Sequence, residues 1–201
     1  MQALIAACRA GDIPADIALV LSNDPAAAGL AFARAAGVAT AAIDHRGFSD
    51  RAAFDSELDR ALSGAGIEFI CLAGFMRLLT RPFVERWRDR LINIHPSLLP
   101  AFPGLDTHRR AIEAGVKFAG CTVHFVRHET DTGPIIIQAV VPVRAGDTPD
   151  GLAARVLAEE HRIYPRALRW VAEGRVRIDG ERAIVAGVSE ADRTLVNPEI
   201  P

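Results

Sequence analysis

The residues best suited to chemistry lie in the sequence NIHPSLLP, at positions 93–100. Asn93 and His95 are two positions apart, so in an extended strand both side chains point to the same side. Pro96 has no backbone N–H to extend a ladder of hydrogen bonds, and therefore the chain leaves the sheet directly after His95. The pattern presents a neutral hydrogen-bond donor and an imidazole together at the carboxyl end of a strand. The alternative is that both side chains only satisfy nearby backbone groups.

Further polar candidates follow in the sequence. His124 shares a strand face with Thr122, although a lone histidine of this kind is more often a satisfied core residue than a ligand. Asp131 lies in the sequence ETDTGP, whose composition is typical of a loop, and an aspartate there commonly forms a turn. The sequence contains no HExxH motif, so we expect no metal site. It also contains no GxSxG motif of a serine hydrolase, no Walker loop and no GxGxxG dinucleotide-binding motif.

A sheet must position these residues, and the hydrophobic pattern predicts one. Strand-type runs at 17–22, 38–43, 67–73, 91–94, 121–126 and 135–143 alternate with helical segments. Helices are expected to begin at Asp24-Pro25, Ser49, Thr80, Thr107 and Thr148-Pro149, and a hairpin is expected at 176–185. This alternation predicts an α/β fold with a Rossmann-like, mostly parallel sheet flanked by helices. Ligands bind beyond the carboxyl ends of the strands in such sheets, which is where Asn93 and His95 lie.

Composition restricts the class of protein. The chain has 201 residues and a net charge of −2, which favours one globular domain and gives no basic field for nucleic acid or an anionic membrane. Its three cysteines are scattered, so neither a disulfide framework nor a zinc motif is expected, and a reducing cytoplasm suits them. The apolar runs are too short for a membrane helix, and the N-terminus lacks the basic start of a signal peptide.

Six segments in fixed order and spacing resemble a known family. They are GFMRLL at 74–79, NIHPSLLP at 93–100, GLDTH at 104–108, GCTVH at 120–124, DTGP at 131–134 and EH at 160–161. Together they closely resemble the phosphoribosylglycinamide formyltransferases of the folate formyltransferase superfamily. The resemblance extends from Met1 to about Gly187, so we expect a formyltransferase domain at 1–188 and a C-terminal tail at 189–201.

The resemblance implies catalytic roles for individual residues. These enzymes pass a formyl group from 10-formyltetrahydrofolate to the amine of glycinamide ribonucleotide through a tetrahedral intermediate. Asn93 and the imidazolium of His95 would donate hydrogen bonds to its oxyanion. Asp131 would stabilise the charged His95 and relay a proton through water. His124 would support Asp131 without contacting the substrate, and Thr122 would have a supporting role of the same kind.

The resemblance also implies where the substrates bind. The folate would enter an apolar pocket and contact a loop at 127–132, with Asn93 and the residues Arg51, Leu72, Met76, Arg77, Leu78, Leu79 and Val84 around it. Glu160 would bind the ribose hydroxyls of the nucleotide, near Met1. Formyl-folate is then a co-substrate, no metal is needed, and the partners are small molecules. Nucleic acid and membranes are not expected as partners, and the chain would be a monomer or a homodimer in the cytoplasm.

The start of the chain departs from the family pattern. Met1 to about Ala10 is predicted to be a helix, whereas the family begins with a strand and a glycine-rich loop that holds the substrate phosphate. Met1-Gln2-Ala3 aligns just after that loop. We therefore expect the formyltransferase fold without its first strand and phosphate loop, as in a chain that starts at an internal methionine.

Two other functions remain open at the level of the sequence. A 10-formyltetrahydrofolate hydrolase shares the Asn, His and Asp, although such enzymes usually carry an extra N-terminal domain. A folate-binding module without activity is the second alternative, because the phosphate loop is missing. A methionyl-tRNA formyltransferase would need a second, basic domain, for which the chain has no room.

Overall fold

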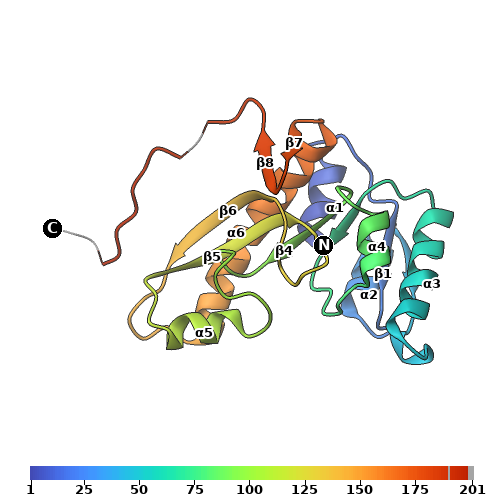
Figure 1. Cartoon of the computed structure of the whole chain (residues 1–201), viewed down its shortest axis with the longest axis horizontal. Helices are drawn as coiled ribbons and strands as arrows, with labels where there is room; N and C mark the ends of the chain where they lie inside the picture. The colour runs from blue at the N-terminus through green and yellow to red at the C-terminus, as the bar shows by residue number, and fades with distance from the viewer. Residues whose placement is uncertain (190, 199–201) are drawn as a thin grey trace.

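The structure is a computed structural model, and it describes residues 1–189 and 191–198. Two groups of strands form its centre (Figure 1). The N-terminal group is a parallel pair in which Leu19 lies opposite Ala39. Its strands and the surrounding helices are β1 (Leu19–Ser22), β2 (Ala39–Ala42), α1 (Gln2–Arg9), α2 (Ala28–Ala35), the 3-10 helix η1 (His45–Gly47) and α3 (Arg51–Gly64).

The second group is a four-stranded sheet in the order β3–β4–β5–β6. Its strands are β3 (Ile70–Leu72), β4 (Leu91–His95), β5 (Phe118–Phe125) and β6 (Ile135–Pro142). The remaining elements are α4 (Arg81–Arg86), α5 (Thr107–Glu113), the long helix α6 (Pro149–Ala172) and a hairpin of β7 (Val176–Asp179) and β8 (Arg182–Val185).

The predicted α/β class, with helices flanking the strands, is confirmed. The pairs β1–β2 and β3–β4 run parallel, as expected for strands joined through helices. The pairs β4–β5 and β5–β6 run antiparallel. A helix-free connection of nine residues, 126–134, joins β5 to β6, and so short a link allows only an antiparallel pair. The hairpin expected at 176–185 is also present.

Two predicted helix starts were misplaced. Helix α2 begins at Ala28 rather than at Pro25, because the Asp24 carboxylate accepts from the Ala26 N–H and closes a turn before the helix. Helix α3 is capped by Asp50 and not by Ser49, since the Asp50 carboxylate accepts from the Ala53 N–H at 2.8 Å. The expected start of α6 is confirmed, with the Thr148 hydroxyl accepting from the Gly151 N–H.

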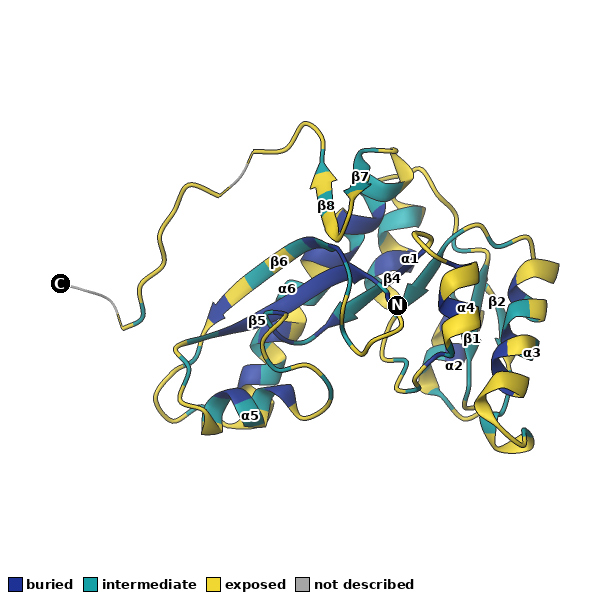
Figure 2. Cartoon of the chain, viewed as in Figure 1, coloured by how far each residue is buried: buried dark blue, intermediate teal, exposed yellow. Residues whose placement is uncertain are grey.

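The apolar side chains form two clusters. One joins α1, α5 and α6 to β4, β5 and β6, and the other joins α3 and α4 to β1 and β3. Figure 2 shows that the buried residues concentrate on β4, β5 and α6, whereas β1 and β2 are mostly half-buried or exposed. Tyr164 of α6 ties its helix to the sheet, because its buried hydroxyl donates to the Leu72 carbonyl at 2.7 Å and lies 3.3 Å from that of Ile92.

The N-terminal residues form the helix that the sequence predicts, α1, whose apolar side buries Leu4 and Ile5. Among residues 1–189 and 191–198, no ladder of hydrogen bonds joins β1 to β3. Within the same described residues, none of the helices has the length and apolar character needed to cross a membrane.

Candidate active site

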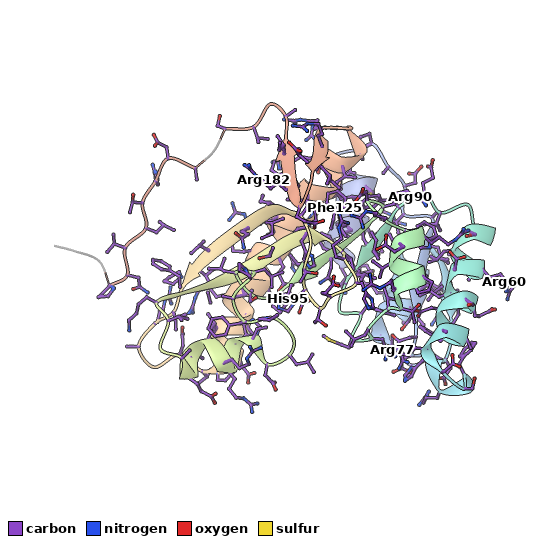
Figure 3. All side chains as sticks on the ribbon, viewed as in Figure 1. Arg60, Arg77, Arg90, His95, Phe125 and Arg182 are labelled. Carbon is purple, nitrogen blue, oxygen red and sulfur yellow. The ribbon has the colours of Figure 1, made fainter. Side chains whose placement is uncertain are left out.

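The carboxyl end of β4 brings the predicted catalytic residues together. Asn93 and His95 lie on one face of β4, as their spacing predicts, and the antiparallel register places Asn93 opposite His124 and His95 opposite Thr122. Figure 3 shows His95 between the sheet and the segment that leads to α5. Four polar side chains from two central strands therefore share one surface of the sheet.

His95 is held at both ring nitrogens. Its Nδ1 lies 3.3 Å from Oδ1 of Asp131, and its Nε2 lies 3.1 Å from the carbonyl oxygen of Phe102. A neutral imidazole has a single N–H, so only the imidazolium donates to both of these acceptors. The ring is 6% exposed, which leaves little water to compete for the contacts. A substrate oxygen that accepts from His95 has to take over the contact now made by Phe102.

Asp131 is fixed by the loop between β5 and β6. One carboxylate oxygen faces His95, and the other accepts a hydrogen bond of 2.6 Å from the backbone N–H of Gly104. Its φ angle of +53° lies in the left-handed region, which aspartate tolerates better than most residues. The carboxylate is therefore turned toward the ring by the backbone itself.

Gly133 explains why the loop takes this course. Its φ is +114°, and a Cβ atom at this position would lie 2.2 Å from the carbonyl oxygen of Phe125. Only glycine fits such an approach of two backbones. The sequence Asp131-Thr-Gly-Pro134 thus combines a charged side chain with the glycine that lets its loop close against β5.

His124 orients Asn93. The Nδ1 atom of His124 lies 3.0 Å from the Phe125 carbonyl and 3.1 Å from the Thr132 carbonyl, so this nitrogen carries the hydrogen. Its Nε2 can then accept from the Asn93 amide at 3.4 Å. Burial lowers the pKa of His124 and favours this neutral form. His124 is predicted to support Asp131, and its hydrogen bonds are to Asn93 and to the backbone carbonyls of Phe125 and Thr132, the second of which adjoins Asp131.

This arrangement has a definite chemical capacity. The Asn93 amide and the His95 ring can place two donors around one oxygen atom, with a carboxylate behind the ring. Such donors stabilise negative charge that develops on a carbonyl oxygen during addition of a nucleophile. The Asp131 carboxylate can also accept or pass on a proton.

The residues expected to bind folate are divided between surface and core. Met76 is 76% exposed and Leu78 is 56% exposed, so both are free to contact a ligand. Leu79 is 9% exposed and packs with Val84 in the cluster of α3 and α4, which makes it a supporting residue. Leu72 packs against the same cluster from β3.

The two arginines expected at the folate lie on the α3 side of the molecule. Arg51 is the exposed first residue of α3. The Arg77 guanidinium lies 5.3 Å from the ring centre of Phe54, which is also on α3, and its buried Nε has no hydrogen-bond partner among the described residues. Figure 3 shows Arg77 beside α3. Each arginine can offer donors to a carboxylate.

The loop at 127–132 makes two ion pairs with α4 and the turn that follows it. The Arg127 guanidinium lies 2.9 Å from the Asp89 carboxylate, and Arg81 of α4 lies 3.6 Å from Glu129. These side chains connect the loop that carries Asp131 to the region of α4.

Glu160, the residue expected to bind the ribose, lies on α6. Burial raises the pKa of Glu160, and the Met1 amine is close enough to lower it in part. Burial lowers the pKa of the Met1 amine in turn, while Cys71 and Glu160 act to raise it. The Met1 amine and the Glu160 carboxylate therefore each favour the charged form of the other. Across the part of the chain that the structure describes, no group of three or more His, Cys, Asp or Glu residues is placed to hold a metal ion.

Comparison with known proteins agrees with this geometry. Residues 1–168 match the family described as formyl transferase. The chain belongs to the formyl transferase family. The formyltransferase of this family in Escherichia coli strain K12, phosphoribosylglycinamide formyltransferase, is 46% identical over 187 residues, which are 93% of this chain and 88% of that protein.

Longer and structural relatives extend the comparison. The human trifunctional purine biosynthetic protein adenosine-3 is 47% identical over 190 residues, and this chain spans only 19% of its length. The crystal structure of glycinamide ribonucleotide transformylase 1 from Symbiobacterium toebii has a TM-score of 0.90 and 52% identity, covering 92% of this chain and 87% of that one. A formyltetrahydrofolate deformylase from Pseudomonas syringae pv. tomato has a TM-score of 0.84 and 27% identity, and 61% of it is covered.

Sequence reasoning missed three contributors to this candidate site. The carbonyl of Phe102 contacts His95, and the N–H of Gly104 donates to Asp131. Every residue has such backbone groups, so the sequence does not indicate which of them take part in a site. Gln138 on β6 donates to Thr122 and to the Leu99 carbonyl. It could have been noticed, because it is the one polar residue in the apolar run IIIQAVV.

Proposed function

We propose that this protein is a phosphoribosylglycinamide formyltransferase, which transfers the formyl group of 10-formyltetrahydrofolate to the amine of glycinamide ribonucleotide in purine biosynthesis. The observation that carries the proposal is the convergence of Asn93, His95 and Asp131 at the end of β4. The relatives named above support it, since the formyl transferases that act on glycinamide ribonucleotide are 46% and 52% identical to this chain.

The reaction assigns a task to each of the three residues. The amine nitrogen of the nucleotide attacks the formyl carbon, and the formyl oxygen becomes negatively charged. Asn93 and His95 donate hydrogen bonds to this oxygen, which replaces the Phe102 carbonyl at His95. When the intermediate collapses, the bond between the formyl carbon and N10 of the folate breaks. Asp131 keeps the imidazolium in place and passes the proton lost by the amine to N10 through water.

The folate site lies between the 74–79 segment and the 127–132 loop. Met76 and Leu78 supply exposed apolar surface for the folate rings, and Leu79 supports them from the core. Arg51 and Arg77 contact the glutamate end of the folate, where the planar guanidinium groups bind a carboxylate. Asn93 then faces the formyl group at the inner end of this site.

Glu160 and the region of Met1 contact the nucleotide. Glu160 accepts hydrogen bonds from the ribose hydroxyls, a role for which an ionised carboxylate is suited. His124 and Thr122 do not touch substrate in this proposal, and they hold Asn93 and the segment after His95.

The wider setting of the protein follows from the same proposal. Residues 1–188 form the formyltransferase domain; of the tail expected at 189–201, residues 190 and 199–201 lie outside the part of the chain that the structure describes. The protein acts in the cytoplasm, binds small molecules and not nucleic acid, needs no metal, and is a monomer or a homodimer.

The experiment that tests the proposal is an ultraviolet assay of deformylated-folate release, with 10-formyl-5,8-dideazafolate as the donor. It is run with and without glycinamide ribonucleotide, on this chain and on a version extended upstream by a strand and a phosphate loop. Release that requires the nucleotide supports the transferase. Release that ignores the nucleotide shows a hydrolase. No release from either protein, with folate-analogue binding retained, shows an inactive binding module.

A further inference from the structure

A row of side chains crosses the sheet next to the catalytic histidine. His95 of β4 lies opposite Thr122 of β5, and Thr122 lies opposite Gln138 of β6. The three residues therefore stand side by side on one face of the sheet, at the spacing at which cross-strand side chains interact. Gln138 is the outermost, and it is exposed to solvent although its amide is bound.

The Thr122 hydroxyl at the centre of the row has all its hydrogen-bonding capacity in use. It donates to the Ser97 carbonyl at 2.7 Å, and it accepts from the Leu99 N–H at 3.1 Å and from the Gln138 amide at 2.9 Å. A hydroxyl has one hydrogen and two lone pairs, so these contacts leave it a single orientation. The Gln138 amide uses its second hydrogen on the Leu99 carbonyl, at 2.9 Å.

These contacts hold the turn that follows His95. The Ser97 hydroxyl donates to the Ala101 carbonyl at 2.6 Å, and the chain then delivers the Phe102 carbonyl to Nε2 of His95. Gly120 of β5 lets the turn lie close, because a Cβ atom there would stand 2.8 Å from a methyl carbon of Leu98. The position of the acceptor at Nε2 of His95 therefore depends on a path that runs from Gln138 through Thr122 to the turn.

We propose that Gln138 is a positioning residue for formyl transfer, whose amide fixes Thr122 and the 97–102 turn and thereby sets the direction in which His95 presents its Nε2–H. The identity of the reaction rests on the proposed function, whereas the effect of Gln138 on the position of His95 does not. Gln138 touches no reacting atom, and it acts by holding the ring of His95 ready for the formyl oxygen.

Two substitutions of Gln138 would remove the hydrogen bonds that its amide donates. A carboxylate at the same position accepts hydrogen bonds but cannot donate, so in Gln138→Glu it would face the Leu99 carbonyl without a hydrogen between them. Thr122 would turn its hydroxyl to the new acceptor and release the Ser97 carbonyl. Gln138→Met removes both donors and keeps the length of the side chain.

The test compares Gln138→Glu and Gln138→Met with Val140→Ala. Val140 is also exposed and lies two residues further along the same face of β6, so it is a matched control. Both Gln138 variants are expected to lower kcat about tenfold, with little change in the KM of either substrate, because a slightly misdirected donor weakens the transition state and not substrate binding. The melting temperature should stay close to that of the control.

A double variant separates positioning from folding. If Gln138 acts through the turn that Thr122 holds, Gln138→Met should cost much less kcat in a Thr122→Val background than alone. Equal costs in both backgrounds would overturn the proposal. A loss of melting temperature that accounts for the whole loss of activity would overturn it too.

A spectroscopic measurement keeps the test independent of turnover. The Nε2–H proton of His95 is assigned in the NMR spectrum by its absence from His95→Gln. In the unchanged protein it should exchange slowly, since the Phe102 carbonyl accepts it, and it should exchange faster in Gln138→Met and not in Val140→Ala. If neither the unchanged protein nor the version extended upstream shows formyl transfer, the proposed function fails, while this proton still decides whether Gln138 positions His95. Exchange that is the same in all three proteins refutes the positioning role.

Discussion

Two regions of the molecule, the strands β4 and β5 and the 74–79 segment, differ in how far their candidate functional residues are buried. On β4 and β5, His95, His124 and Thr122 are buried and Asn93 is half-buried, and their side chains are hydrogen-bonded to neighbouring strand, turn and loop residues. In the 74–79 segment, two of the side chains proposed to contact folate, Met76 and Leu78, are exposed to solvent. In the proposed mechanism, the groups that act on the reacting atoms are thus fixed before substrate arrives, whereas the two exposed side chains proposed to bind the folate rings have few contacts of their own. Fixed donors need no reorganisation during the reaction, which is where such donors gain most of their effect.

The largest effect is expected on the free energy of unfolding, when one leucine from each half of the molecule is replaced by alanine. Leu152 of α6 is 0% exposed and Leu78 is 56% exposed. Leu152→Ala should lower the free energy of unfolding by about 3 kcal/mol, because it leaves a cavity in the core. Leu78→Ala should leave it within about 0.5 kcal/mol and raise the KM for the folate. Urea unfolding and steady-state kinetics measure the two quantities. Similar losses of stability in both variants would remove the contrast between the halves.

His95→Ala tests the fixed half through catalysis. The variant should lose about 3 kcal/mol in kcat/KM, since one of the two donors to the oxyanion disappears. Folate-analogue binding, measured by fluorescence titration, should change little. A change confined to KM would mean that His95 only binds substrate.

Asp131→Asn should have a smaller effect of the same kind. The amide keeps the shape of the side chain but loses the charge that holds the imidazolium, so kcat should fall about 10²-fold with nearly unchanged folate affinity. Single-turnover kinetics of the variant, compared with those of the unchanged protein, measure the chemical step alone. An unchanged kcat would refute the role of Asp131 in proton transfer.

Glu160→Gln has the smallest expected effect, and it relates stability to function. Burial raises the pKa of Glu160 above its ordinary value of 4.5, so the folded state holds this proton more tightly than the unfolded state. The stabilisation by this group is full below pH 4.5 and is lost as the pH rises through the raised pKa. Glutamine does not ionise. The variant should therefore be more stable than the unchanged protein at neutral pH and no more stable below that window.

The same substitution should weaken nucleotide binding. We expect a raised KM for the nucleotide and a nearly unchanged KM for the folate. Urea unfolding between about pH 4 and about pH 8 measures the first effect, and steady-state kinetics measure the second. A variant that is less stable at neutral pH, or one that raises both KM values equally, would show that α6 itself is disturbed.

Local rules predicted the parts of the fold that depend on few residues. Pro96 ends β4, Thr148 starts α6, and the spacing of Asn93 and His95 places them on one face. The start of α3 was missed because Ser49 and Asp50 are both good capping residues, and only the three-dimensional course of the chain selects Asp50.

Contacts between residues that are far apart in the sequence could not be predicted from these local rules. The pairing of His95 with Asp131 joins residues 36 positions apart, and it requires the register of β4, β5 and β6 together with the left-handed turn at Asp131. The sequence indicated it only through resemblance to a family. Gln138 stayed unnoticed because its partners are two backbone segments and a threonine on another strand.

Tyr164 has a consequence for the spacing of the two substrates. Its hydroxyl joins α6 to the carbonyls of Leu72 on β3 and Ile92 on β4, and Glu160 lies one helical turn before it. Helix and sheet cannot slide past one another without breaking these contacts. The distance from the proposed ribose ligand on α6 to Asn93 on β4 is therefore built into the protein as a fixed length. A nucleotide whose amine is too close to its ribose, or too far from it, would be rejected by geometry before any chemistry begins.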